Sequence, residues 1–135
     1  MRMARYVLAA ALAIGGARMS TAEAAEAGLE GAWLQEGTEC AAVFARSGKA
    51  ASFKKPVNIF APAFIISGNQ VRTPQASCRI RSVKPAGERR ILVLSCATPV
   101  SVDQTRAILG PAENGSLRRY LNDQDTTGSS YRRCT

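Results

Sequence analysis

The stretch CRIRSVKPAGERRILVLSC, residues 78–96, begins and ends with a cysteine and has Gly87 at its centre. If the chain folds back within residues 84–88, the two cysteines lie opposite each other and Ile80 lies opposite Leu94. The cysteines and the apolar pattern select the same register independently, and a slip of one residue would destroy the match. The segment is therefore predicted to form a β-hairpin with one mostly apolar face.

The opposite face of this hairpin carries arginines. Continuing the register toward the turn places Ser82 opposite Leu92, and it puts Arg79, Arg81 and Arg89 on the face away from the cysteines. We predict that these three arginines line one outward face and form part of any site for an acidic partner. A face that is merely solvated is the alternative.

Short runs rich in β-branched and aromatic residues, separated by turn-forming residues, continue on both sides of the hairpin. This rhythm predicts an all-β meander. Closure removes exposed strand edges, so we expect a small antiparallel up-and-down β-barrel of about eight strands, with a β-sandwich as the alternative. A short helix within 103–109 or 56–61 is also compatible with the pattern. The predicted strands lie near residues 29–36, 40–46, 50–54, 63–67, 70–73, 77–83, 89–97, 100–109, 116–121 and 130–134.

The four cysteines are predicted to form two structural disulfides. The hairpin register favours Cys78–Cys96, which leaves Cys40–Cys134. The second bridge would tie the last strand to an early one and so close the sheet. The two other pairings would require the hairpin to be out of register. A redox or metal role would need Cys-x-x-Cys spacing or histidine partners, and the sequence has neither.

The N-terminus reads as a secretory signal peptide. Arg2 and Arg5 precede an apolar stretch at 6–17, and Ala22-Glu23-Ala24 supplies small residues for a cleavage site. We therefore predict cleavage after Ala24, a single β-barrel domain over residues 25–135, and a periplasmic or secreted location. No later segment is apolar enough to predict a transmembrane span.

The net charge of +8 is unevenly distributed along the chain. From Arg46 onward, 15 basic residues stand against five acidic ones. Such a surface favours an acidic protein or an anionic envelope component as partner. We expect a monomer that does not bind nucleic acid, because export removes it from most nucleic acid and its aromatic residues do not alternate with the basic ones.

Enzyme chemistry has little support in this sequence. There is no histidine, the usual proton carrier near neutral pH. Asp123 and Asp125 lie in a loop that loosely resembles a calcium-binding loop, but Cys134 replaces the glutamate expected at its twelfth position. We therefore predict no catalytic residue, no metal site and no cofactor, and we interpret this loop as a solvated turn.

Gly31-Ala32-Trp33, at the start of the first predicted strand, is similar to the opening of lipocalin-type barrels. More narrowly, the layout resembles the small periplasmic inhibitors of secreted zinc metalloproteases, which share a signal peptide, an early Gly-x-Trp, a nearby cysteine and an eight-stranded barrel. The resemblance implies structural roles for Gly31 and Trp33, and an N-terminal segment that enters a protease active site. That family has one disulfide, and here only residues 25–30 precede Gly31. The chain also looks like a family of small exported bacterial proteins that end in a Tyr131-Arg132-Arg133-Cys134 type sequence.

Three functions of different classes follow from these expectations. The first is an envelope protein-binding module, with inhibition of a secreted hydrolase as its narrower form. The alternatives are a lipocalin-like small-ligand binding protein and a structural or stress-related envelope protein. An interior cavity would favour the ligand carrier, but short strands predict a barrel filled by its own side chains. The predicted filling residues are Trp33, Phe44, Phe53, Phe64, Ile65, Leu92 and Leu94.

Overall fold

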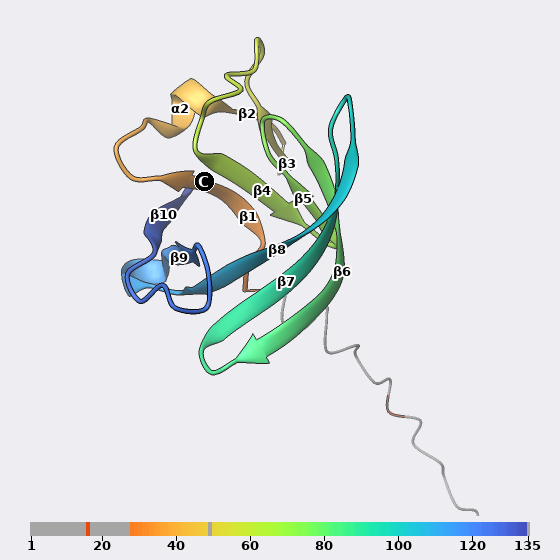
Figure 1. Cartoon of the computed structure of the whole chain (residues 1–135). Helices are drawn as coiled ribbons and strands as arrows, with labels where there is room; N and C mark the ends of the chain where they lie inside the picture. Colours follow the sequence, from red (N-terminus) through yellow and green to blue (C-terminus); the bar gives the residue numbers. More distant parts are fainter. Residues whose placement is uncertain (1–15, 17–27, 49, 135) are drawn as a thin grey trace, which may run out of the picture.

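The computed structural model describes residues 16, 28–48 and 50–134, and these form a closed antiparallel β-barrel with a small hairpin beside it (Figure 1). The predicted signal peptide, residues 1–24, lies outside the described residues apart from Gly16. The elements are β1 (Gly31–Gln35), α2 (Cys40–Val43), β2 (Phe44–Ser47), β3 (Ala50–Phe53), β4 (Ala63–Ser67), β5 (Gln70–Arg72), β6 (Ser77–Ala86), β7 (Arg89–Ala97), β8 (Val102–Pro111), η1 (Glu113–Gly115), β9 (Leu117–Tyr120) and β10 (Ser129–Cys134).

The barrel contains eight strands in the order β1-β10-β9-β8-β7-β6-β5-β4, and β1 pairs with both β10 and β4. Every strand is antiparallel to its neighbours, and strands β4 to β10 follow one another in chain order. The predicted up-and-down barrel is confirmed, and closure through β1 excludes the sandwich. The predicted strands match the observed ones within a few residues, except that the one at 40–46 begins with the single turn α2. Residues 103–109 belong to β8, and 56–61 form a loop instead of a helix.

The central hairpin of β6 and β7 has the predicted register at its open end. The two cysteines are paired residues, and Ile80 pairs with Leu94. Beyond Ile80 the prediction is wrong by one residue, because the register shifts between Ile80 and Ser82 and Ser82 pairs with Val93 instead of Leu92. The hairpin therefore contains a β-bulge.

The bulge reconciles two geometric demands on the hairpin. The last pair before the turn is Ala86 with Arg89, which leaves a two-residue loop of Gly87 and Glu88. Gly87 has a φ of 63°, which suits the first position of a tight hairpin turn. In the sequence, however, Cys78 and Cys96 are equally distant from the single residue Gly87, which would leave a turn with an odd number of residues. One extra residue on β6, Arg81, absorbs the difference, as a bulge does.

Trp33 closes one end of the barrel, which we call the floor. Its side chain is 0% exposed, and its Nε1–H donates to the carbonyl of Leu29 at 2.8 Å. The guanidinium of Arg133, on β10, lies over its ring, 4.7 Å from the centroid. Gly31 has a φ of +133°, and a Cβ there would contact the Arg133 side chain. The Gly-x-Trp motif therefore builds the floor, with Gly31 supplying the backbone conformation and Trp33 the bulk.

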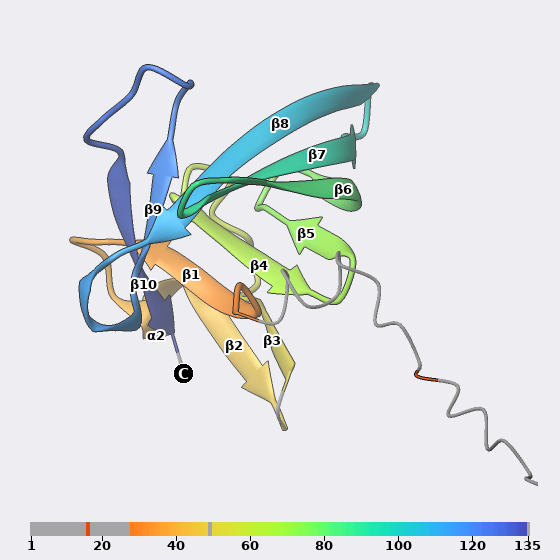
Figure 2. The same cartoon turned by 90° about the horizontal axis from the view of Figure 1, so that it is seen from below.

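A second apolar layer lies outside the barrel, where α2 and the β2–β3 hairpin cover the outer face of β1 and β4 (Figure 2). Phe44 and Phe53 of this hairpin stack on each other and belong to this outer cluster. The two predicted disulfides, Cys40–Cys134 and Cys78–Cys96, are confirmed. The role expected for Cys40–Cys134 is wrong, because hydrogen bonding between β1 and β10 already closes the sheet. The bridge instead fastens the outer layer to the barrel.

Candidate functional site

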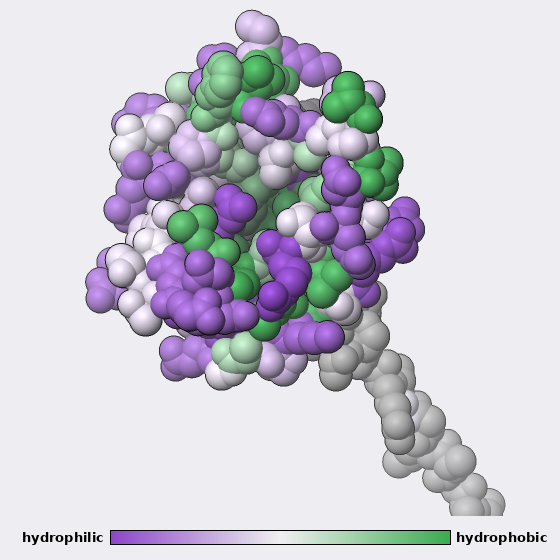
Figure 3. All heavy atoms as spheres, in the orientation of Figure 1, coloured by the Kyte–Doolittle hydropathy of each residue, from purple (hydrophilic) through white to green (hydrophobic). Residues whose placement is uncertain are grey.

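The barrel is hollow between its floor and its opposite end, which we call the mouth. A cavity of about 350 Å³ lies there, walled mainly by apolar side chains of β4 to β8. Leu92 and Leu109 lie deep in its wall, and the Cys78–Cys96 bridge forms part of its inner surface. Trp33, which fills the floor, is not among the lining residues. Figure 3 looks toward this hollow, where apolar side chains lie recessed among hydrophilic ones.

The prediction of a filled interior is therefore wrong. Of the residues expected to fill it, Phe44, Phe53 and Ile65 lie in the outer cluster beneath the β2–β3 hairpin. Trp33, Phe64 and the two leucines do face inward. Three large side chains expected in the interior thus lie outside the barrel, and the interior has an open space near the mouth.

Arg119 is the cationic side chain that faces into the cavity from β9. Its strand partner Leu109 and its second neighbour Leu117 both belong to the interior cluster, and side chains two apart share a face. Arg119 lines the cavity and is exposed at its mouth. Among the described residues, no carboxylate oxygen lies within ion-pair distance of its guanidinium, and the side chain has no hydrogen-bond partner.

The other polar side chains of the cavity are largely engaged. The Thr73 hydroxyl accepts hydrogen bonds from the backbone of its own loop, and the Gln75 amide donates to the carbonyl of Ile59 at 2.8 Å. Thr105 is different, since it faces inward from β8 opposite Leu94 and its hydroxyl bonds to none of the described residues. The polar groups available to a ligand are therefore Arg119, Thr105 and the hydroxyl of Tyr131, which also bonds to none of the described residues.

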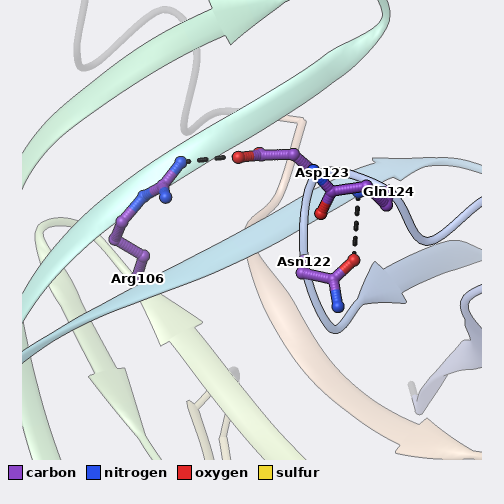
Figure 4. A network of polar contacts seen from close by, with 4 residues as sticks. All are labelled: Arg106, Asn122, Asp123 and Gln124. Carbon is purple, nitrogen blue, oxygen red and sulfur yellow. Dashed lines mark hydrogen bonds and ion pairs between the residues drawn. The ribbon is translucent and has the colours of Figure 1, made fainter.

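Arg106 also lines the cavity and is held by an ion pair. Its guanidinium approaches the carboxylate of Asp123 in the loop between β9 and β10 at 3.6 Å (Figure 4). Both side chains are more than half exposed, so the pair contributes little to stability. Toward the mouth, the last pair between β8 and β9 is Ile108 with Tyr120. Beyond that pair, the Arg106–Asp123 ion pair connects β8 to the loop that follows β9.

The loop at 121–128 is organised by Asp125. Its carboxylate accepts hydrogen bonds from the backbone N–H groups of Leu121, Thr127 and Gly128. These bonds, led by the one from Leu121, lower the pKa of the Asp125 carboxyl. Asp123 turns away to Arg106, so the two carboxylates have separate partners. The loop is therefore a turn built around one carboxylate.

We expect the order of this loop to depend on pH. The folded pKa of Asp125 lies below its ordinary value of 3.8, so its contribution is present above that value and is lost as the pH falls through the folded pKa. Amide hydrogen exchange at Thr127 and Gly128 should therefore accelerate in acid beyond the intrinsic trend. D125N, which keeps one acceptor but does not ionise, should remove this dependence, and an identical acid profile in D125N would contradict the assignment.

Large apolar side chains are exposed around the same end of the barrel. The loop before β4 contains Phe60, which is 82% exposed, the tip between β7 and β8 contains Val100 at 93%, and Leu121, which follows β9, is 90% exposed. The loop before β4 and the tip between β7 and β8 both project toward the top of Figure 1. All the exposed large hydrophobics of the described residues lie in or beside these three connections. The mouth is therefore rimmed by apolar side chains.

The three arginines predicted as a partner site do not form one cluster. Arg79 and Arg81 are exposed on β6, and Arg81 is the bulge residue. Arg89 lies at the turn, six paired positions or roughly 20 Å along the hairpin from Arg79 at the usual strand rise. It stacks over the Tyr120 ring, 3.5 Å from the centroid, and donates to the carbonyl of Asp125. A binding role for Arg79 and Arg81 stays a prediction.

A second hollow, of about 360 Å³, lies between the β2–β3 hairpin and the barrel. Arg46, Arg72 and Arg133 line it together with Glu30. Arg72 is bonded to the carbonyl of Ala51, and Arg133 lies over the floor tryptophan, so two of the three guanidinium groups already hold the fold together. The cavity of the barrel is the better candidate site.

Comparisons with known proteins give no independent assignment. The chain matches no protein-family model, and comparisons with curated proteins and with solved structures gave no match. Within the part of the chain that the structure describes, no helix is long and apolar enough to cross a membrane. The same residues contain no cluster of three or more histidine, cysteine or acidic side chains arranged to hold a metal.

Proposed function

We propose that this protein binds a small, largely apolar molecule inside its barrel. The observation that carries the proposal is the hollow between the Trp33 floor and the mouth, walled by side chains such as Leu92 and Leu109. Eight-stranded barrels either fill their interior or hold one small ligand, and this one leaves its interior partly empty. A wet apolar cavity is unfavourable, so displacing its water by an apolar group drives binding.

The size of the cavity limits the ligand. About 350 Å³ is near the lower end of the range for small-molecule sites, which begins at about 300 Å³. Its wall is also held in shape, because the Cys78–Cys96 bridge joins β6 to β7 on the inner face. A preformed cavity lowers the ordering cost of binding. The ligand is therefore a compact molecule or a short alkyl chain, not a large lipid.

A cavity-filling substitution tests the proposal. N-phenylnaphthylamine, a neutral apolar fluorophore, should bind the oxidised protein and brighten as it leaves water. Ala107 is half-buried and faces the cavity from β8, so A107F places a ring in the binding space. We expect this variant to lose most of the fluorescence enhancement.

The control is A97F, which adds the same ring at an exposed position near the end of β7. This variant should bind the fluorophore like the unmodified protein. If A107F binds equally well, or if the unmodified protein does not bind at all, the cavity is not a site for small apolar molecules.

A role as a protein-binding module, with the partner bound at the rim instead of in the cavity, is a second proposal, supported by the exposed rim of Phe60, Val100 and Leu121. Exposed aromatic and aliphatic side chains at loop tips are suited to contacts with another protein. For inhibition of a protease, the resemblance requires an inserting N-terminal segment. Residues 25–27 lie outside the described residues, and Leu29 is buried and bonded to Trp33. The rim is therefore the part of the described chain that best supports a protein partner.

A further inference from the structure

We infer that the ligand of the cavity is an amphiphile whose anionic head group is bound by Arg119, with its apolar part directed toward the floor. This inference rests on the proposed function and specifies the chemical class of the ligand. It is carried by one juxtaposition: a guanidinium without a carboxylate partner faces the mouth of an apolar cavity.

The position of Arg119 separates the two ends of such a ligand. Its strand partner Leu109 lies in the interior cluster, so the cavity below the arginine is apolar. The arginine itself is exposed at the mouth, where its charge remains hydrated without a ligand. A molecule with its apolar part against Leu109 and Leu92 would therefore have its head group beside the guanidinium and near the inward-facing Thr105.

The charges near the mouth favour an anion over a cation. Arg106 and Asp123 neutralise each other in their ion pair, and the carboxylate of Asp125 is saturated by backbone N–H groups. The Asp103 carboxylate, at the start of β8, accepts a hydrogen bond from the Ser101 hydroxyl and is not among the cavity-lining residues. Among the lining residues that the structure describes, Arg119 is therefore the charged side chain without a compensating partner. A guanidinium offers paired donors that match the geometry of a carboxylate or another oxyanion, whereas it repels an ammonium group.

Three probes with one alkyl chain test the head-group preference. Decanoate, decanol and decylamine differ only in their head groups, which are anionic, neutral and cationic at neutral pH. Isothermal titration calorimetry with the full oxidised chain should show the tightest binding for decanoate. We expect about a tenfold advantage over decanol, the low end for a charge-assisted hydrogen bond, because the mouth is partly solvated. The advantage should shrink as salt is added.

The variant R119Q should bind decanoate about as weakly as decanol while leaving decanol binding unchanged. Retained decanol binding shows that the variant is folded and its cavity intact. K84Q is the matched control, because it also removes one positive charge, from an exposed residue of β6 that is not among the cavity-lining residues. It should bind all three probes like the unmodified protein.

The outcomes separate this inference from the proposed function. If decanol and decanoate bind equally, or if R119Q keeps the preference for decanoate, the cavity binds apolar molecules but Arg119 does not select an anion, and the inference is overturned. If K84Q weakens decanoate binding as much as R119Q does, the preference comes from net charge and the inference is also overturned. If none of the probes binds, the proposed function fails and the inference fails with it.

Discussion

Replacing Trp33 by alanine should lower the free energy of unfolding by ~3–5 kcal/mol, as expected for a large aromatic side chain removed from a core. The indole is completely buried, packs in the interior cluster and is covered by Arg133. Its loss would also leave the Leu29 carbonyl without its donor. Because small domains have a net stability of only ~5–15 kcal/mol, this change should remove much of it. Urea unfolding followed by circular dichroism measures the loss.

W33F separates packing from hydrogen bonding at the floor. The phenyl ring retains part of the buried area but cannot donate to Leu29, so this variant should lie between W33A and the unmodified protein. An unfolding midpoint of W33A equal to that of the unmodified protein would show that Trp33 does not support the floor.

The fold was predictable from sequence because local patterns agreed with one another. Cys78 and Cys96 fixed the register of one hairpin, and the alternation of Ile80 with the flanking arginines fixed its inner face. Those signals predict the strand pairing near the cysteines, but they do not predict the register beyond a β-bulge. Whether the turn contains two residues or three depends on the backbone at Gly87, which apolar alternation does not report.

The outer layer could have been anticipated from β4. Its sequence Ala63-Phe64-Ile65-Ile66 is a continuous apolar run, and all four residues are buried. Strands with one solvated face alternate, whereas strands covered on both faces are continuously apolar. The run therefore indicates that something covers the outside of the barrel there. With Phe44 and Phe53 assigned to that cover, the interior has fewer large side chains than a filled barrel would need.

Arg119 was not among the predicted site residues, and composition could not have identified it. It stands next to Arg118 in a basic chain, and the two differ only in the face they occupy. Alternation from Leu117, which is interior, places Arg119 inward and Arg118 outward. The absence of a described carboxylate near Arg119 depends on where Asp123 and Asp125 turn, and those turns follow from loop hydrogen bonds. Charge compensation is thus a property of the fold.

Removing the Cys40–Cys134 bridge, as in C40A/C134A, should lower the free energy of unfolding more than removing the Cys78–Cys96 bridge does. The bridge spans 94 residues, and loop-closure entropy gives ~4.7 kcal/mol for a loop of this order, against ~3 kcal/mol for a loop like that of Cys78–Cys96, which spans 18. We expect a correspondingly lower free energy of unfolding for C40A/C134A than for C78A/C96A, measured by urea denaturation without reductant.

The location of the bridge predicts a second, local effect of the same variant. Cys40 begins α2, and Cys134 ends β10, so their bond fastens the β2–β3 hairpin over the outer face of the barrel. Without it, the hairpin should detach more often, and trypsin should cut after Arg46 and Lys54 before the barrel unfolds. In C78A/C96A the outer layer keeps its bridge, so these sites should stay protected under native conditions. Equal cleavage in the two variants would show that packing of Phe44 and Phe53, rather than the bridge, holds this layer in place.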